Sequence, residues 1–158
     1  MDLTFLTGFL GGVVGAASKE AISWVFKEAA RRQSELDAVE GMVLSTASEV
    51  RTLAIAHWSE AETSPTALAR RASIVARIQF CGKLYPELFK GSIDEKRNMD
   101  VLFVRFRQEL TGGEFGQADR VAMPERANDI EIATYEVMHQ MKMGRIRSRR
   151  VRFLPFSK

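Results

Sequence analysis

Residues 36–57 read "LDAVEGMVLSTASEVRTLAIAH", and the spacing of their apolar side chains decides the fold class. Apolar residues recur at alternating intervals of three and four, the period of one helix face. They are Leu36, Val39, Val43, Val50 and Leu53, with Thr46 and His57 at the other seam positions. The same phase runs back through Ala29 and Val25 to Ile22. The pattern predicts one long helix that ends near Glu60 and that only Gly41 weakens.

A long helix with such a seam packs on partner helices, either from its own chain or from neighbouring copies. Thr46 and His57 place polar groups in the seam. A pure coiled coil keeps its seam apolar, so the sequence favours an intrachain bundle.

Three further helices are predicted after this one. Ser64 and Pro65 read as an N-cap and a first helical residue, and Pro86 is expected to end or kink that helix after Tyr85. The helix carries Leu68, Ala72, Val75, Ile78 and Leu84. The next helix begins at the capping-box pair Ser92 and Glu95 and ends at Gly112-Gly113. Its apolar face holds Met99, Leu102, Phe103, Phe106 and Leu110.

The last helix is predicted from about Pro124 to Gly144. Its heptad-spaced side chains are Ala127, Ile130, Thr134, Val137 and Met141. Strand-like alternation is confined to "RIRSRRVRF" at 145–153. The predicted class is all-α, a small bundle of about four helices.

Residues 3–26, "LTFLTGFLGGVVGAASKEAISWVF", are uncharged from Leu3 to Ser18. As a helix they would extend roughly 36 Å, against about 30 Å for a hydrocarbon core. Lys19 and Glu20 oppose a span, although they lie past its midpoint and lysine can reach the headgroups. We expect a transmembrane helix, and a buried interface in a soluble oligomer or an amphipathic surface segment are the alternatives.

Charged residues around this segment indicate its orientation. The Met-Asp-Leu start lacks the positive charge of a signal peptide, so an uncleaved anchor is expected. Lys27, Arg31 and Arg32 follow the segment, which predicts a single-pass protein with its C-terminal body in the cytoplasm. A single cysteine, Cys81, agrees with a reducing compartment.

Small residues in the same segment predict self-association. Glycines four residues apart lie on one side of a helix and let a second helix approach closely. The predicted oligomerisation residues are Gly8, Gly11, Gly12 and Gly15. The first expected partner is therefore another copy of the chain, a homo-oligomer.

The C-terminus is strongly basic. Seven of the 23 basic residues and none of the 20 acidic ones lie within 142–158, so the remainder of the chain is net acidic. The predicted contacts to an anionic partner are Arg145, Arg147, Arg149, Arg150 and Arg152. An acidic protein, an anionic lipid or a nucleic acid would suit them equally.

No catalytic signature, metal site or cofactor motif is predicted. His57 and His139 are far apart in sequence, and Cys81 has no second cysteine with which to build a metal site. "LTGGEFGQ" lacks the lysine and hydroxyl of a phosphate-binding loop and is expected to be a helix C-cap with a turn. The chain is therefore not expected to be an enzyme.

These observations predict three parts: a membrane-anchor and oligomerisation helix at 1–32, a cytosolic helical bundle at 33–143 and a basic tail at 144–158. The expected function is that of a membrane-anchored, self-associating helical protein. It would be a membrane-perturbing effector that its bundle and a binding partner control. The alternative is a soluble assembly or nucleic-acid-binding subunit whose apolar N-terminus is buried between protomers.

Overall fold

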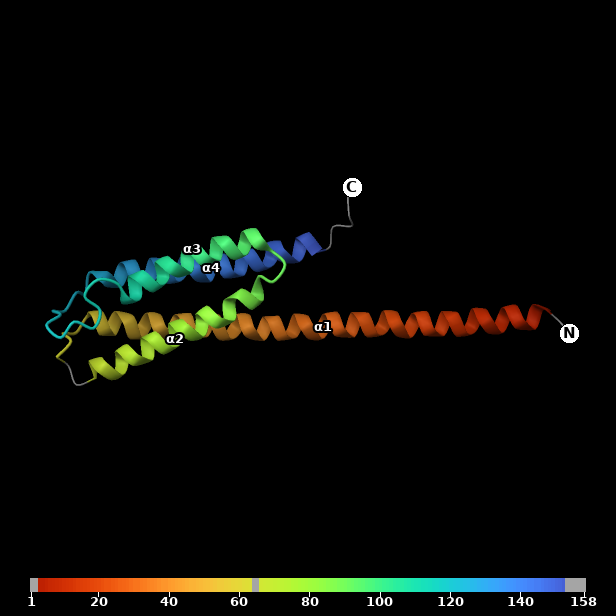
Figure 1. Ribbon diagram of the computed structural model, residues 1–158, viewed down its shortest axis with the longest axis horizontal. Helices are drawn as coiled ribbons and strands as arrows, with labels where there is room; N and C mark the ends of the chain where they lie inside the picture. The colour runs from red at the N-terminus through yellow and green to blue at the C-terminus, as the bar shows by residue number, and fades with distance from the viewer. Residues whose placement is uncertain (1–2, 64–65, 153–158) are drawn as a thin grey trace. The chain divides into compact units, whose positions relative to one another are not determined.

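The protein is described by a computed structural model over residues 3–63 and 66–152, with side chains described for 23–63 and 66–147. Figure 1 shows four helices, α1 (Leu3–Trp58), α2 (Ala67–Leu88), α3 (Ile93–Thr111) and α4 (Arg126–Arg152). Over these ranges there is no strand. The predicted all-α class and small helical bundle are confirmed.

The chain divides into two units, Met1–Ala38 and Val39–Lys158. α1 is an unbroken helix of 56 residues that passes through Gly41 and ends close to the predicted position. None of the helices in the described part of the chain is both long enough and apolar enough to cross a bilayer.

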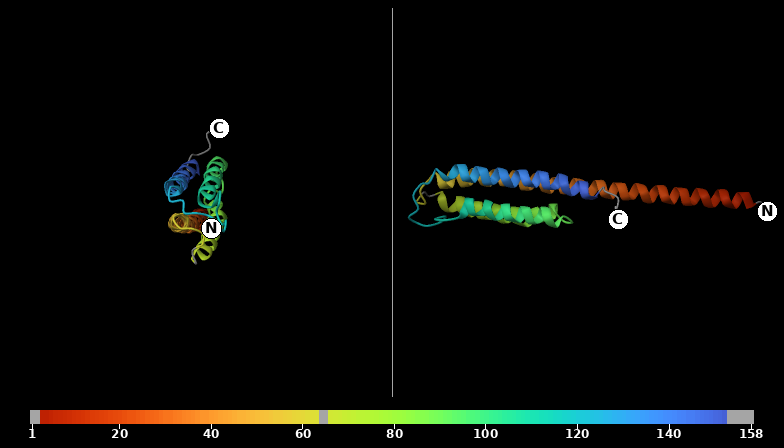
Figure 2. Two further views of the ribbon diagram at one scale, coloured as in Figure 1. Left: turned by 90° about the vertical axis from the view of Figure 1, so that its left-hand side faces the viewer. Right: turned by 90° about the horizontal axis from the view of Figure 1, so that it is seen from above.

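The core lies in the second unit. α1 contributes buried Val43, Ala47, Val50, Ala54 and Trp58, which follow one helix face. α3 and α4 lie side by side, as both views of Figure 2 show. Their buried apolar residues are Met99, Phe106, Leu110, Ile130, Ala133, Val137 and Met141. The apolar faces predicted for α3 and α4 are therefore confirmed in the main, whereas of the seam predicted for α1 only Val43, Val50 and His57 are buried.

α2 departs from its predicted pattern. Of the five apolar residues noted above on this helix, only Ile78 is buried, whereas Leu68 is 65% and Val75 38% exposed. The inward face carries Ile74, Ile78, Cys81 and Tyr85 instead. Three arginines of α2 form ion pairs with Glu60, Glu62 and Glu49 in and just after α1, which is consistent with this rotation.

The sequence predicts the start of α2 at Ser64 and Pro65 and its end or a kink at Pro86. Ser64 and Pro65, its predicted start, lie outside the described residues. Pro86 does not end the helix after Tyr85, since α2 continues to Leu88 with Pro86 inside it. A proline in the last turn costs only one hydrogen bond, and the Phe89 N–H donates to the Pro86 carbonyl at 3.2 Å.

α3 has the predicted bounds but not the predicted cap. It starts after Ser92 and ends at Thr111 before Gly112. The Ser92 side chain makes no capping hydrogen bond. Glu95 instead accepts hydrogen bonds from Gln140 at 2.9 Å and from Arg147 at 3.4 Å, so it joins α3 to α4.

α4 is longer than predicted, because Gly144 does not end it and the helix continues to Arg152. Gly144 is buried in a close helix contact, where a Cβ would lie 2.8 Å from Phe89 Cε1 and 3.0 Å from Glu95 Oε2. The glycine is needed for close packing and not for a helix stop. Residues 145–152, which showed strand-like alternation, are helical.

Candidate functional site

The predicted oligomerisation glycines Gly8, Gly11, Gly12 and Gly15 lie within α1. Their surroundings are outside the part of the structure whose side chains are described. Their role therefore stays a prediction.

The described part of α1 that follows these glycines exposes large apolar side chains. Trp24 is 67% and Phe26 71% exposed, with Val25 exposed between them. Charged residues come next, and Arg31 pairs with Glu28 at 2.8 Å and with Glu35 at 3.1 Å within the helix. Exposed pairs at this spacing add only about 0.3–0.5 kcal/mol each. An exposed aromatic band thus precedes a charged helical stretch.

Two of the predicted partner-binding arginines are engaged inside the chain. Arg145 is buried, and its Nε lies 2.8 Å from Glu40 Oε2 of α1. Arg147 pairs with Glu95 at 3.4 Å. The side chains of Arg149, Arg150 and Arg152 lie outside the described residues. Arg145 therefore holds α4 to α1, and binding of an anionic partner stays a prediction.

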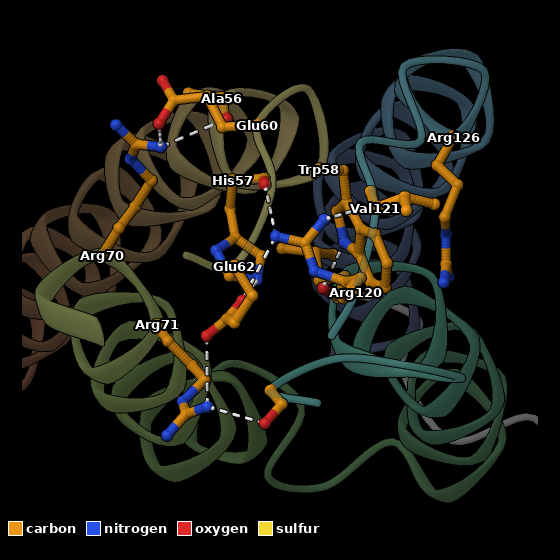
Figure 3. A network of polar contacts seen from close by, with 12 residues as sticks. Ala56, His57, Trp58, Glu60, Glu62, Arg70, Arg71, Arg120, Val121 and Arg126 are labelled. Carbon is orange, nitrogen blue, oxygen red and sulfur yellow. Dashed lines mark hydrogen bonds and ion pairs between the residues drawn. The ribbon is translucent and has the colours of Figure 1, made fainter. Parts of the chain in front are cut away.

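A buried polar network lies where α1 ends, and Figure 3 shows its members. Arg120, from the loop between α3 and α4, has a side chain that is 0% exposed. Its Nη2 donates to the His57 carbonyl at 2.9 Å and to Glu62 Oε2 at 3.2 Å. Its Nη1 donates to the Val121 carbonyl at 3.2 Å. These hydrogen bonds offset most of the free-energy cost of burying the Arg120 guanidinium away from water.

Glu62 is the only carboxylate drawn in contact with Arg120 in Figure 3, and it serves a second arginine as well. Arg71 of α2 donates to Glu62 Oε1 at 3.2 Å and to the Gly116 carbonyl at 3.0 Å. Gly116 has φ +84°, and a Cβ there would lie 2.6 Å from Arg71 Nη1. The positive φ favours glycine at this turn, and the lack of a side chain leaves room for the Arg71 guanidinium.

Main-chain bonds hold the same loop, residues 112–125, to the end of α1. The Glu62 N–H donates to the Arg120 carbonyl at 3.2 Å, and the Met123 N–H donates to the Trp58 carbonyl at 2.7 Å. The Trp58 indole N–H donates to the Leu110 carbonyl at 3.0 Å. Loop and helix end therefore form one hydrogen-bonded body.

Trp58 lies between two guanidinium groups. The Cζ of Arg126 is 4.0 Å and that of Arg120 4.9 Å from its ring, within the range of cation–π attraction. Arg126 also donates to the carbonyls of Gly112 and Glu109 at the end of α3. It thereby caps a helix C-terminus, where a cation is favourable.

His57 is wholly buried beside this network. Its Nε2 lies 3.5 Å from Glu62 Oε2, but neither imidazole nitrogen makes a hydrogen bond within the described residues. Burial lowers the pKa of His57 below its ordinary value of 6.5, the charge of Arg120 lowers it further, and Glu62 opposes both. The histidine is neutral at pH 7.

The remaining candidate residues show no catalytic arrangement. Cys81 is buried, and burial raises the pKa of its thiol to about 11, so it is protonated and unreactive at neutral pH. His139 is exposed on α4. Among the residues that the structure describes, no three His, Cys, Asp or Glu side chains are grouped to hold a metal ion. The 112–116 turn ends α3 and begins the loop, as predicted for "LTGGEFGQ".

The outer face of α2 is a second apolar surface. It forms a hollow of about 400 Å³ lined by Leu68, Arg71, Ala72, Val75, Ala76 and Gln79. Of the charged side chains of α2, Arg70, Arg71 and Arg77 form ion pairs with carboxylates of other segments, and Arg71 also lines this hollow. This surface was not predicted, because helix periodicity alone does not show which side chains of α2 pair with carboxylates of other segments.

The buried network was likewise not predicted. Arg120 and His57 are 63 residues apart, and Arg120 stands alone between turn residues with no periodic pattern around it.

Comparisons with protein families, with characterised proteins and with solved structures give no match.

Proposed function

We propose that the chain is a helical protein held at a membrane by its N-terminal helix, through which copies also associate. The helical unit at 39–158 would lie in the cytoplasm, bind a partner and control a membrane-perturbing activity of the assembled N-terminal helices. The observation that carries this proposal is the exposed aromatic band of α1, Trp24 and Phe26, which follows the uncharged run 3–18 after the charged pair Lys19 and Glu20.

Physical properties of this band support membrane contact. Exposed tryptophan and phenylalanine lose contact with water when they enter the interfacial region of a bilayer, where aromatic rings are favoured. Lys27, Arg31 and Arg32 follow at once and suit the anionic cytoplasmic leaflet. Gly8 and Gly12, and Gly11 and Gly15, have the spacing that brings helices close in a membrane.

The same band also supports the second candidate, a soluble assembly in which copies cover one another's apolar N-terminal helices. Exposed Trp24, Val25 and Phe26 would then be interface residues, and aromatic residues are enriched at such sites. The two candidates differ in whether lipid is needed.

Membrane fractionation of the full chain tests the proposal. We expect the protein to sediment with membranes, and a carbonate wash separates an inserted helix, which is retained, from a surface-bound one, which is released. Replacing Trp24 and Phe26 together by serine should lower the membrane-bound fraction at least tenfold, because each buried ring contributes about 1.5–3 kcal/mol.

Val101→Ser is the matched control, because Val101 is an equally exposed apolar residue on α3 and should not affect sedimentation. A wild-type protein that stays in the supernatant as a stable oligomer would favour the soluble assembly. A double variant that sediments like wild type would remove the aromatic band from the proposed contact.

A further inference from the structure

We propose that His57, Glu62 and Arg120 form a pH-sensitive switch, which holds the 112–125 loop on the end of α1 at neutral pH and releases it on acidification. The switch rests on one shared atom. Arg120 Nη2 donates to Glu62 Oε2 at 3.2 Å, and His57 Nε2 lies 3.5 Å from the same oxygen. A protonated His57 would compete with Arg120 for that oxygen.

The charges around His57 determine how acidification affects the loop. The groups that face the imidazole are Glu62 beyond the end of α1, Arg120 of the loop, and Arg70 and Arg71 of α2. The guanidinium of Arg126 of α4 lies over the neighbouring Trp58 ring. The Glu62 carboxylate already balances Arg120 and Arg71, so a proton on His57 would add a third cation to one carboxylate. Such an excess of buried charge is relieved when one cation leaves.

Arg120 is the cation that belongs to a loop, whereas Arg70 and Arg71 belong to α2, so its departure moves the loop and leaves the helices in place. When it leaves, the loop loses its bonds to the His57 carbonyl and to Glu62. The main-chain bonds of Glu62 to Arg120 and of Met123 to Trp58 are the next to open. Release would expose Trp58 and Phe115, whose rings pack against His57.

Proton linkage determines whether the closed loop gains or loses stability as the pH falls. His57 has the ordinary pKa of 6.5 in the unfolded chain and a lowered pKa in the closed site. Release of the loop removes the charge of Arg120, which lowers that pKa, and leaves Glu62, which raises it. The closed state is therefore fully favoured above pH 6.5 and loses ground as the pH falls toward the lowered value. The opening equilibrium rises up to about tenfold for each pH unit in that window.

Amide hydrogen exchange of the full chain at pH 7.5 and pH 5.5, corrected for intrinsic rates, tests the switch. We expect the amides of Glu62 and Met123 to lose protection at pH 5.5, while those of buried Phe106 and Ile130 keep theirs. His57→Gln should remove this pH dependence. His139→Gln, the matched control at the exposed histidine, should behave like wild type.

His139→Gln also leaves His57 as the one imidazole of the chain, so its NMR signal can be titrated even where His57→Gln does not fold. We expect that signal to titrate below pH 6.5 together with the loss of loop protection. Titration without loss of protection, an equal loss at Phe106 and Ile130, or an unchanged pH response in His57→Gln would each overturn the switch.

Discussion

Arg120 is a charged side chain kept wholly from solvent at a bundle end, and its hydrogen bonds go to the end of α1, to Glu62 just beyond it and to its own loop. Long charged side chains are almost never fully buried unless they are paired. Its position therefore costs stability unless Glu62, the His57 carbonyl and the Trp58 ring are all in place. The loop conformation depends on this one residue.

Replacing Arg120 by methionine should lower the free energy of unfolding by about 3–5 kcal/mol. The methionine keeps an apolar stem but leaves the buried Glu62 without its closest buried counter-charge. Urea unfolding of the full chain measures the loss. Arg97→Met, at an exposed arginine of α3, is the control and should change the value by no more than about 0.5 kcal/mol. Equal midpoints for the two variants would contradict the role given to Arg120.

At the scale of elements, helix existence could be predicted from the sequence and helix detail could not. A 3.6-residue period in α1, α3 and α4 reports burial of one face, and the buried Val50, Phe106 and Val137 follow it. The inward turn of α2 depends on Glu49, Glu60 and Glu62 elsewhere in the chain. The buried network likewise depends on a contact between Arg120 of the loop and residues distant in sequence. Neither the orientation of α2 nor this network therefore has a signal in the local sequence.

Gly144 and Gly41 are a matched pair that separates packing from helix propensity. Gly144→Ala should lower the free energy of unfolding by about 1–3 kcal/mol, because its Cβ would lie 2.8 Å from Phe89 Cε1. Gly41→Ala should raise it by about 0.5–1 kcal/mol, because nothing lies within 4 Å of its Cβ and alanine favours the helix. Thermal or urea unfolding compares them. A gain in stability in both variants would mean that Gly144 is not in close contact.

At the scale of the whole molecule, the proposed assembly can be tested through Gly12. Gly12→Leu keeps the N-terminal segment apolar and should keep the protein at the membrane, while it holds neighbouring helices apart. We expect crosslinked oligomers to fall several-fold, both in detergent and in intact membranes. Any growth inhibition caused by assembly on overexpression should fall with them.

Phe9→Leu is the control for this substitution, since it changes an apolar residue of the same segment without filling a small-residue position. It should crosslink like wild type. An undiminished ladder of oligomers for Gly12→Leu would mean that other parts of the chain hold the copies together.

The ion pairs formed by the α2 arginines also affect how the protein responds to its solvent. A surface rich in free charge is kept soluble by repulsion between molecules, and salt screens that repulsion. The outer face of α2 carries the apolar Leu68, Ala72, Val75 and Ala76, and the charge of Arg71 at its hollow is paired with Glu62. Sulfate strengthens apolar association because it is excluded from protein surfaces. Contacts made through the outer face of α2 should therefore strengthen as sulfate is added. Contacts made through arginines at the C-terminus should weaken as ionic strength rises.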